Sequence, residues 1–147
     1  MKNKIVKNIL ILVILLIIID QCSKILVVNN IKESIGNTFL GIEVVSNTGM
    51  AFGFYKGNLR NIFLTICVLA LIVWFIRNQL ERIDFKTQIA LSIILAGGIS
   101  NLLDRIFRGA ILDFIRIYKF PIFNIADIYV VVGWVLLVIF LIIYSKK

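Results

Sequence analysis

The chain has 147 residues, of which 61% are hydrophobic and only 16% charged, whereas a soluble domain carries about 45–50% apolar and about 25% charged residues. This composition excludes an ordinary soluble fold, and it also excludes a disordered chain, because disorder requires low hydrophobicity together with high net charge. We therefore expect a small integral membrane protein that forms one domain over residues 1–147, since a domain usually takes about 100–200 residues.

The formal net charge is +8, from 16 Lys and Arg against 8 Asp and Glu. In a soluble protein this excess would suggest a nucleic-acid partner, but here lysines lie beside the apolar segments at both ends of the chain: Lys2, Lys4, Lys7, Lys146 and Lys147. Basic residues at such positions usually contact lipid headgroups. The charge thus predicts membrane lipids, and no nucleic acid, as partners.

Four long apolar stretches predict four transmembrane helices, because about 20 residues are needed to cross a bilayer and a charge at its centre is costly. We place the spans at about 6–28, 60–77, 87–105 and 127–145. The first span carries a polar girdle from Asp20 to Lys24, after which apolar residues resume. No small-x-small cleavage site follows the apolar run, so we interpret this segment as a retained helix rather than a signal peptide.

An even number of spans places both termini on one side of the membrane. Lys and Arg are equally numerous on the two sides, but on the side of the termini they are concentrated in short loops and tails. Because such concentration marks the cytoplasmic side, we predict that both termini are cytoplasmic.

The two connecting segments on the opposite side, about 29–59 and 106–126, are long for helix connections and are expected to be structured or functional. Phe39–Val45 and Ala110–Ile117 mix β-branched and aromatic residues and have turn formers nearby. The expected fold class is thus an all-α integral membrane protein, with four transmembrane helices and a small β-rich structure on the extracytoplasmic side.

The residue inventory excludes several kinds of enzyme. Histidine is absent, which rules out zinc proteases of the HExxH type and hydrolases that use a histidine base. Cys22 and Cys67 are isolated and predict neither a disulfide framework nor a metal motif. A Ser23–Lys24 dyad is disfavoured, because neighbours in sequence on a helix do not face each other. We expect no metal and no cofactor.

Carboxylates at membrane depth are the remaining chemical feature. Four acids stand at or near helix ends on the outer side: Asp20, Asp104, Asp113 and Asp127. Asp113 lies in the apolar run Gly109–Ile115, and an ionisable residue at such depth is a functional candidate by default. A salt bridge from Asp113 to Arg116 is the structural alternative.

The other acids have structural alternatives too. Asp127 opens the last span, where a carboxylate stabilises a helix through the helix dipole. Asp20 and Lys24, like Asp104 and Arg108, are spaced i,i+4 and could neutralise each other as helical ion pairs. For each of these acids considered singly, the structural role is the more frequent one.

Two aspartates held close together share a proton and can act as general acid and general base, because like-charge repulsion separates their pKa values. Such a pair needs no metal and no histidine, and it can hydrolyse an amide. Pro121 lies between Asp113 and Asp127 and favours a turn. The spacing therefore permits contact between these two carboxylates.

Polar residues recur near these acids. Asn47, Asn101 and Asn124 lie near the proposed outer face, and Asn101 stands among Leu, Ile and Gly residues, so it needs a hydrogen-bond partner. Structural hydrogen bonding is an open alternative for each asparagine. Arg105 either snorkels to the membrane surface or orients a carboxylate or a lipid phosphate.

Five segments together resemble the bacterial lipoprotein signal peptidases, the type II signal peptidase family of intramembrane aspartic proteases. The segments are Asp20-Gln21 with Lys24, Asn47–Gly53, Gly97–Arg105, Gly109–Ile115 and Phe123–Asp127. Each segment alone is a weak signal. Five of them in this order on a four-span chain are specific, and they extend over nearly the whole sequence.

The resemblance implies that Asp113 and Asp127 are the catalytic pair and that six residues shape or support the site: Asp20, Lys24, Asn47, Asn101, Arg105 and Asn124. The implied substrate is a prolipoprotein whose cysteine already carries diacylglycerol, with cleavage just before that cysteine. Family members have an outer β-cradle that embraces the substrate, and they are targets of the cyclic peptide globomycin. The implied location is the bacterial cytoplasmic membrane, with the site toward its outer face.

Two positions depart from the family pattern. Met50 and Ser100 stand where the family more often has small residues or glycine. Ser100 adjoins Asn101, so the departure concerns the packing around this asparagine.

Two alternatives come from other classes of protein. A small proton-coupled carrier or channel would relay protons through intramembrane acids, but it predicts acids spread through the membrane and often an inverted repeat. Here the acids cluster near one face, and no internal repeat is present. A purely structural partner of another membrane enzyme would leave the carboxylate of Asp113 unexplained.

Overall fold

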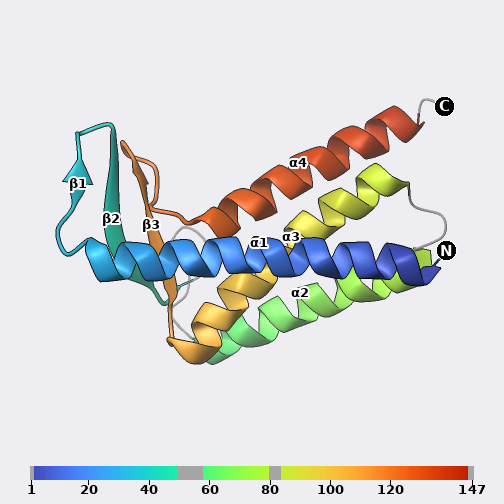
Figure 1. Ribbon diagram of the computed structural model, residues 1–147, viewed down its shortest axis with the longest axis horizontal. Coiled ribbons are helices and arrows are strands. Elements are labelled where there is room, and N and C mark those ends of the chain that lie inside the picture. Colours follow the sequence, from blue (N-terminus) through green and yellow to red (C-terminus); the bar gives the residue numbers. More distant parts are fainter. Residues whose placement is uncertain (1, 50–57, 80–83, 146–147) are drawn as a thin grey trace.

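The computed structural model describes residues 2–49, 58–79 and 84–145. The elements in chain order are α1 (Lys2–Asn30), β1 (Ile35–Gly36), β2 (Leu40–Asn47), α2 (Asn58–Gln79), α3 (Phe85–Phe107), β3 (Ile111–Ile117) and α4 (Ile125–Ser145). The helices form an elongated bundle, and the strands form a sheet at one end of it (Figure 1). The first helix begins, and the last helix ends, at the opposite end of the bundle.

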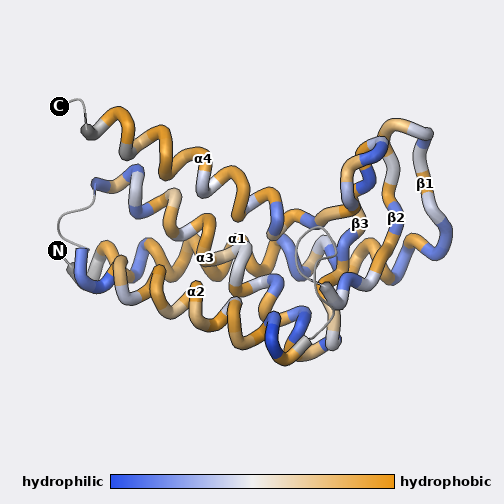
Figure 2. The backbone as a smooth tube through the Cα atoms, turned by 180° about the vertical axis from the view of Figure 1, so that it is seen from behind, coloured by the Kyte–Doolittle hydropathy of each residue, from blue (hydrophilic) through white to orange (hydrophobic). Residues whose placement is uncertain are grey.

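The surface of the bundle is apolar. Each helix contains the corresponding predicted span. Helices α1, α2 and α3 are long and apolar enough to cross a membrane, and the stretch Ile125–Phe140 of α4 is apolar as well. Large side chains such as those of Ile18, Phe63 and Trp134 are exposed, and hydrophobic residues run along most of each helix (Figure 2). Such surfaces are stable in lipid rather than in water, so the chain is a multi-pass membrane protein.

The central helix is α3, which packs against α1, α2 and α4. In α3, 61% of the most apolar stretch is buried, against 17% in α1 and 11% in α2. The buried side chains of the hydrophobic core come from all four helices: Val13, Ile76, Ala90, Leu91, Ile94, Leu95, Ala96 and Leu137. The other three helices are therefore positioned mainly through their contacts with α3.

Glycines allow α3 and α4 to approach closely. Gly97 lies against the first turn of α4, where an added Cβ atom would come within 2.4 Å of the Ala126 carbonyl oxygen. Gly133 lies against Ile94, and its Cβ atom would come within 2.6 Å of that side chain. Small residues at such contacts permit the van der Waals packing that holds helices together in lipid. The contact at Gly97 lets the first turn of α4 lie directly against α3.

The sheet is antiparallel in the order β1-β2-β3. The strands predicted at Phe39–Val45 and Ala110–Ile117 are therefore confirmed, and the first of them continues to Asn47. The strand β1 was not expected from the sequence. This short strand depends on a tight turn, in which Gly36 has a φ of 118° and the Asn37 side chain accepts a hydrogen bond from the Leu40 N–H at 2.8 Å.

One irregularity in the sheet decides which side chains share a face. Ile42 pairs with Ile115 and Val45 pairs with Asp113, so β2 contains an extra residue between the two pairs. Such a bulge moves all residues beyond it to the other face of the strand. As a result, Asn47 and Asp113 lie on the same face of the sheet; regular pairing would have placed them on opposite faces.

The close approach at Gly97 makes a test of the packing possible. We expect Gly97→Ala to lower the free energy of unfolding by about 1–3 kcal/mol, because the methyl group would press on the backbone of α4. Gly98→Ala is the matched control, since its Cβ would meet only the end of the Leu69 side chain, at 2.8 Å. Thermal unfolding of both variants in detergent measures the difference, and equal melting temperatures would contradict this account.

Candidate active site

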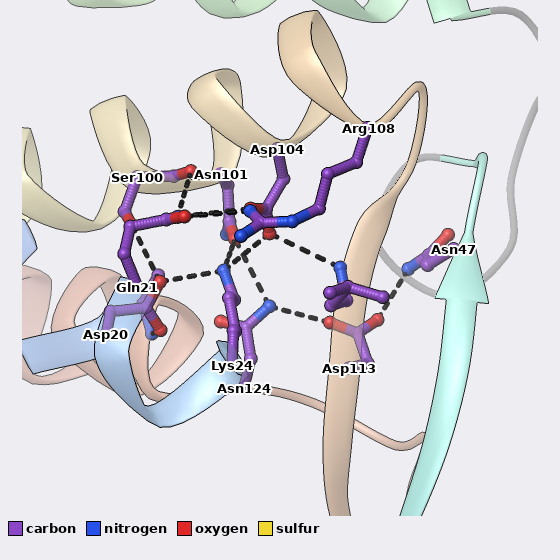
Figure 3. A network of polar contacts seen from close by, with 12 residues as sticks. Asp20, Gln21, Lys24, Asn47, Ser100, Asn101, Asp104, Arg108, Asp113 and Asn124 are labelled. Carbon is purple, nitrogen blue, oxygen red and sulfur yellow. Dashed lines mark hydrogen bonds and ion pairs between the residues drawn. The ribbon is translucent and has the colours of Figure 1, made fainter. Parts of the chain in front are cut away.

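Four aspartates from four different elements come together where the bundle meets the sheet. They are Asp20 of α1, Asp104 of α3, Asp113 of β3 and Asp127 of α4. The first three are buried and the fourth is half-buried. Buried carboxylates need hydrogen-bond donors around them, and Figure 3 shows a continuous network of such contacts.

Asp113 is held by two asparagines from separate parts of the chain. Its Oδ2 accepts a hydrogen bond from Asn47 Nδ2 at 2.9 Å, across the bulged strand pair. Its Oδ1 accepts a hydrogen bond from Asn124 Nδ2 at 2.6 Å. Both oxygens of this buried carboxylate therefore receive neutral amide donors.

The alternative of a salt bridge between Asp113 and Arg116 is wrong. Arg116 Nε lies 3.2 Å from Glu43 Oε2 instead, and Arg116 Nη2 donates to the Asn37 carbonyl oxygen at 3.2 Å. The reason is the period of a strand, in which residues three apart point to opposite faces. The carboxylate of Asp113 thus faces the helices without a directly paired cation from its own strand.

Asp127 caps the helix that it opens. Asn124 Oδ1 accepts a hydrogen bond from the Asp127 N–H at 2.9 Å, and Asp127 Oδ2 accepts one from the Asn124 N–H at 3.1 Å. This reciprocal pair is a capping box, so the helix-terminal role suggested for Asp127 is confirmed. Its other oxygen, Oδ1, accepts a hydrogen bond from Asn101 Nδ2 at 2.8 Å and so connects it to the rest of the site.

A chain of amides joins the two aspartates. Asn124 Nδ2 contacts Asp113 and also donates to Asn101 Oδ1 at 3.1 Å, and Asn101 in turn donates to Asp127. Lys24 Nζ donates to Asn101 Oδ1 at 3.2 Å, and because an ammonium group only donates, it fixes the orientation of this amide. The partner expected for Asn101 is thus present.

The pKa of the Asp113 carboxyl is raised to about 6, chiefly by burial. The hydrogen bond from Asn47 opposes the rise, and the negative charge of Asp127 adds to it. Carboxyl groups with pKa values moved toward neutrality are typical of acid–base sites. Asp113 can therefore gain or lose a proton near neutral pH.

The remaining two aspartates have a cation between them. Lys24 Nζ lies 2.7 Å from Asp20 Oδ2 and 2.7 Å from Asp104 Oδ2, as Figure 3 shows. The predicted i,i+4 ion pairs of Asp20 with Lys24 and of Asp104 with Arg108 are both confirmed. The contact between Lys24 and Asp104 joins two helices and was not expected from the sequence.

Arg105 lies beside the network. It is buried, and its Nη2 donates to the Gly49 carbonyl oxygen at 3.0 Å. The arginine thus ties α3 to the segment that follows β2, rather than extending to the membrane surface.

Both Asp113 and Asp127 line a cleft of about 480 Å³, which we call the aspartate cleft. Its polar residues include Asn47, Asn101, Arg105, Asp113 and Asp127, and its apolar residues include Phe120, Val130 and Val131. Thr65 of α2 and Gly98 of α3 also line this cleft. The cleft can therefore hold a largely apolar molecule with a polar group directed at the two carboxylates.

Several residues of the site were not expected from the sequence. Ser100, identified only as a departure from a family pattern, donates to Asp20 Oδ2 at 2.6 Å and is fully buried. Thr65 and Gly98 line the aspartate cleft, and the hydroxyl of Thr65 within an apolar helix was the available signal. Met50, with the rest of the segment 50–53, lies outside the described residues.

Comparison with known proteins gives consistent matches over most of the chain. A family model described as Signal peptidase (SPase) II matches residues 12–143. A lipoprotein signal peptidase of Fusobacterium nucleatum is 34% identical over 146 residues, which cover 92% of this chain and 87% of that protein. The lipoprotein signal peptidase of Clostridioides difficile is 33% identical over 144 residues, which cover 94% and 97%.

Two solved structures, each described as a bacterial membrane enzyme, are similar in fold. The first has 30% sequence identity and a TM-score of 0.84, covering 95% of this chain and 90% of the other. The second has 31% identity and a TM-score of 0.81, covering 92% of each chain. The similarity therefore includes both the helix bundle and the sheet.

The raised pKa of Asp113 predicts a stability effect with a defined sign. The folded state favours the protonated carboxyl of Asp113. The free energy of unfolding of the wild type should therefore fall relative to that of Asp113→Asn as the pH rises from 3.8, the ordinary pKa of an aspartate, to about 6, its pKa in the folded protein. Above that pH the difference should level off. Melting temperatures of both proteins, measured in detergent across this range, give the difference. A difference in melting temperature that does not change with pH would contradict a raised pKa for Asp113.

Proposed function

We propose that this chain, which belongs to the signal peptidase II family and so removes signal peptides from prolipoproteins, acts as an intramembrane aspartic endopeptidase. In this proposal Asp113 and Asp127 are the catalytic pair. The observation that carries it is that two carboxylates from separate segments share one amide network and line one cleft. The substrate is a diacylglyceryl-modified prolipoprotein, cleaved before its lipidated cysteine.

The pair would work with one shared proton. One carboxylate takes a proton from a water molecule, whose oxygen attacks the scissile carbonyl carbon, while the other carboxyl group protonates the carbonyl oxygen. A proton then passes to the amide nitrogen, the C–N bond breaks, and the product has a new carboxyl group and a new amine. The proton belongs to the coupled pair, so its macroscopic pKa values describe both groups together.

The remaining site residues support this chemistry. Asn47, Asn101 and Asn124 donate hydrogen bonds that hold the two carboxylates in place. A positioned pair loses less entropy on reaching the transition state than a mobile one. Arg105 lines the aspartate cleft beside both acids, where its charge can orient a substrate carbonyl group.

The arrangement of the helices suggests how a membrane-embedded substrate reaches the pair. α2 and α4 pack on α3 from opposite sides (Figure 1), and the aspartate cleft is lined by Thr65 of α2, Gly98 of α3 and Val131 of α4. Val131 is also exposed on the lipid-facing surface. A signal peptide in the bilayer could therefore enter the cleft sideways between α2 and α4, and cyclic peptides of the globomycin type should compete for the same cleft.

The same proposal includes the orientation in the bacterial cytoplasmic membrane. Both termini would be cytoplasmic, and the sheet and the catalytic pair would face the outer side. The first helix begins and the last helix ends opposite the sheet (Figure 1), which supports termini and catalytic pair on opposite sides of the membrane, and the concentration of Lys and Arg near the termini favours the cytoplasm for that side. A proton carrier would need acids through the depth of the membrane, whereas the four aspartates lie at one end of the bundle.

Amide replacements test the catalytic pair. With a lipidated prolipoprotein in detergent and a chelator present, we expect Asp113→Asn and Asp127→Asn each to reduce cleavage at least about 100-fold, since each loses an acid–base group but keeps its size. The matched control is Glu43→Gln, which makes the same chemical change at a half-exposed position of the sheet. It should retain wild-type activity.

Two results would overturn the proposal. If the wild-type protein does not cut a validated substrate, the peptidase assignment fails and a proton-transport assay in liposomes becomes the next step. If either amide variant keeps nearly full activity, the assignment of the pair is wrong.

A further inference from the structure

Two buried acids outside the proposed catalytic pair hold the backbone directly beside that pair. Asp20 Oδ1 accepts a hydrogen bond from the Ala126 N–H at 2.8 Å, and Asp104 Oδ2 accepts one from the Leu112 N–H at 3.3 Å. Ala126 and Leu112 are the residues immediately before the two proposed catalytic aspartates. Each catalytic side chain is therefore preceded by a peptide group that is anchored on another helix.

Lys24 connects the two anchoring acids. Its Nζ lies 2.7 Å from Asp20 and 2.7 Å from Asp104, and all three side chains are fully buried. The third hydrogen bond of the ammonium group goes to Asn101 Oδ1, so its three donors are all used. Any rearrangement would leave a buried charge unpaired, which is costly, and the geometry of the three groups is therefore rigid.

We infer that Asp20, Lys24 and Asp104 form a positioning triad that sets the separation between the carboxylates of Asp113 and Asp127. Asp20 attaches the first turn of α4 to α1, and Asp104 attaches β3 to α3. Lys24 then fixes the distance between these two attachments. This inference rests on the proposed function, because the separation matters only if the two aspartates act together.

Separation determines how strongly the two carboxylates share a proton. Like-charge repulsion drives the two macroscopic pKa values of such a pair apart, and it weakens with distance. The other charged groups facing the pair are Lys24 and Asp20 from α1 and Arg105 from α3. A change in the triad should thus alter the width of the pH profile as well as the rate.

Asn replacements in the triad cannot reproduce the acids. Asp104 Oδ1 accepts from Gln21 Nε2 at 3.1 Å and from Arg108, and its Oδ2 accepts from Lys24 and the Leu112 N–H. An amide at this position would point an N–H group at another donor whichever way it is turned. The side chain must then move, and the hydrogen bond to the backbone of β3 is lost.

The test is the kinetics of Asp104→Asn and Asp20→Asn on the lipidated substrate, per mole of folded enzyme. We expect kcat to fall about 100-fold, as for a misplacement of about 1 Å, with KM within about twofold of wild type because the apolar side chains that line the aspartate cleft are the same in the variants. We also expect a narrower bell-shaped dependence of kcat on pH, since the released carboxylates move apart. Loss of folded protein alone would lower the height of this pH profile and leave the two pKa values that bound it unchanged.

Arg108→Gln is the matched control, because Arg108 also contacts Asp104 but neither bridges the two acids nor holds the backbone beside the pair. It should keep the wild-type kcat and pH profile. If a single Asn variant does not fold, the double variant Asp104→Asn/Lys24→Met, which removes one negative and one positive charge together, is measured against the same expectations.

The outcomes separate the two proposals. An inactive wild-type protein overturns the peptidase mechanism and the triad with it. An active wild type whose triad variants have unchanged pH limbs, or the same kcat as Arg108→Gln, overturns the triad alone.

Discussion

A charged side chain at membrane depth is stable only when groups of opposite charge surround it, and Lys24 meets this condition through two aspartates at 2.7 Å. Those contacts also connect α1 with α3. Each aspartate also accepts a hydrogen bond from a backbone N–H. The start of α4 and the start of β3 are therefore attached to the same cluster of charged side chains. Charge neutralisation and the placement of the site are thus achieved by the same few contacts.

Environment distinguishes three chemically identical side chains of the site, those of Asp20, Asp104 and Asp113. Asp20 and Asp104 lie in direct contact with a cation, whereas within the part of the chain that the structure describes the oxygens of Asp113 accept hydrogen bonds from the amide groups of two asparagines. A neutral donor stabilises a carboxylate less than an ion pair does, and burial raises the pKa of Asp113 to about 6. The first two acids therefore suit a structural role, and the third is able to exchange a proton.

Local structural features bring residues that are distant in the sequence to one point. The bulge in β2 turns Asn47 toward Asp113, and the capping box of α4 holds Asn124 where it contacts the same carboxylate. Gly97 lets the first turn of α4 lie directly against α3. Each of these features belongs to ordinary secondary structure or helix packing. Together they place the side chains that form the polar side of the aspartate cleft.

The sequence by itself determined the membrane class, the four helices, two of the three strands and the ion pairs spaced i,i+4, because all of these depend on composition or on the fixed period of a helix or strand. It also contained the motifs that identify the family. Only the tertiary structure decided that Lys24 bridges to Asp104, that Asn47 meets Asp113 and that Arg116 pairs with Glu43. These contacts join separate elements, and their geometry depends on helix packing and on a one-residue bulge, neither of which follows from a local pattern.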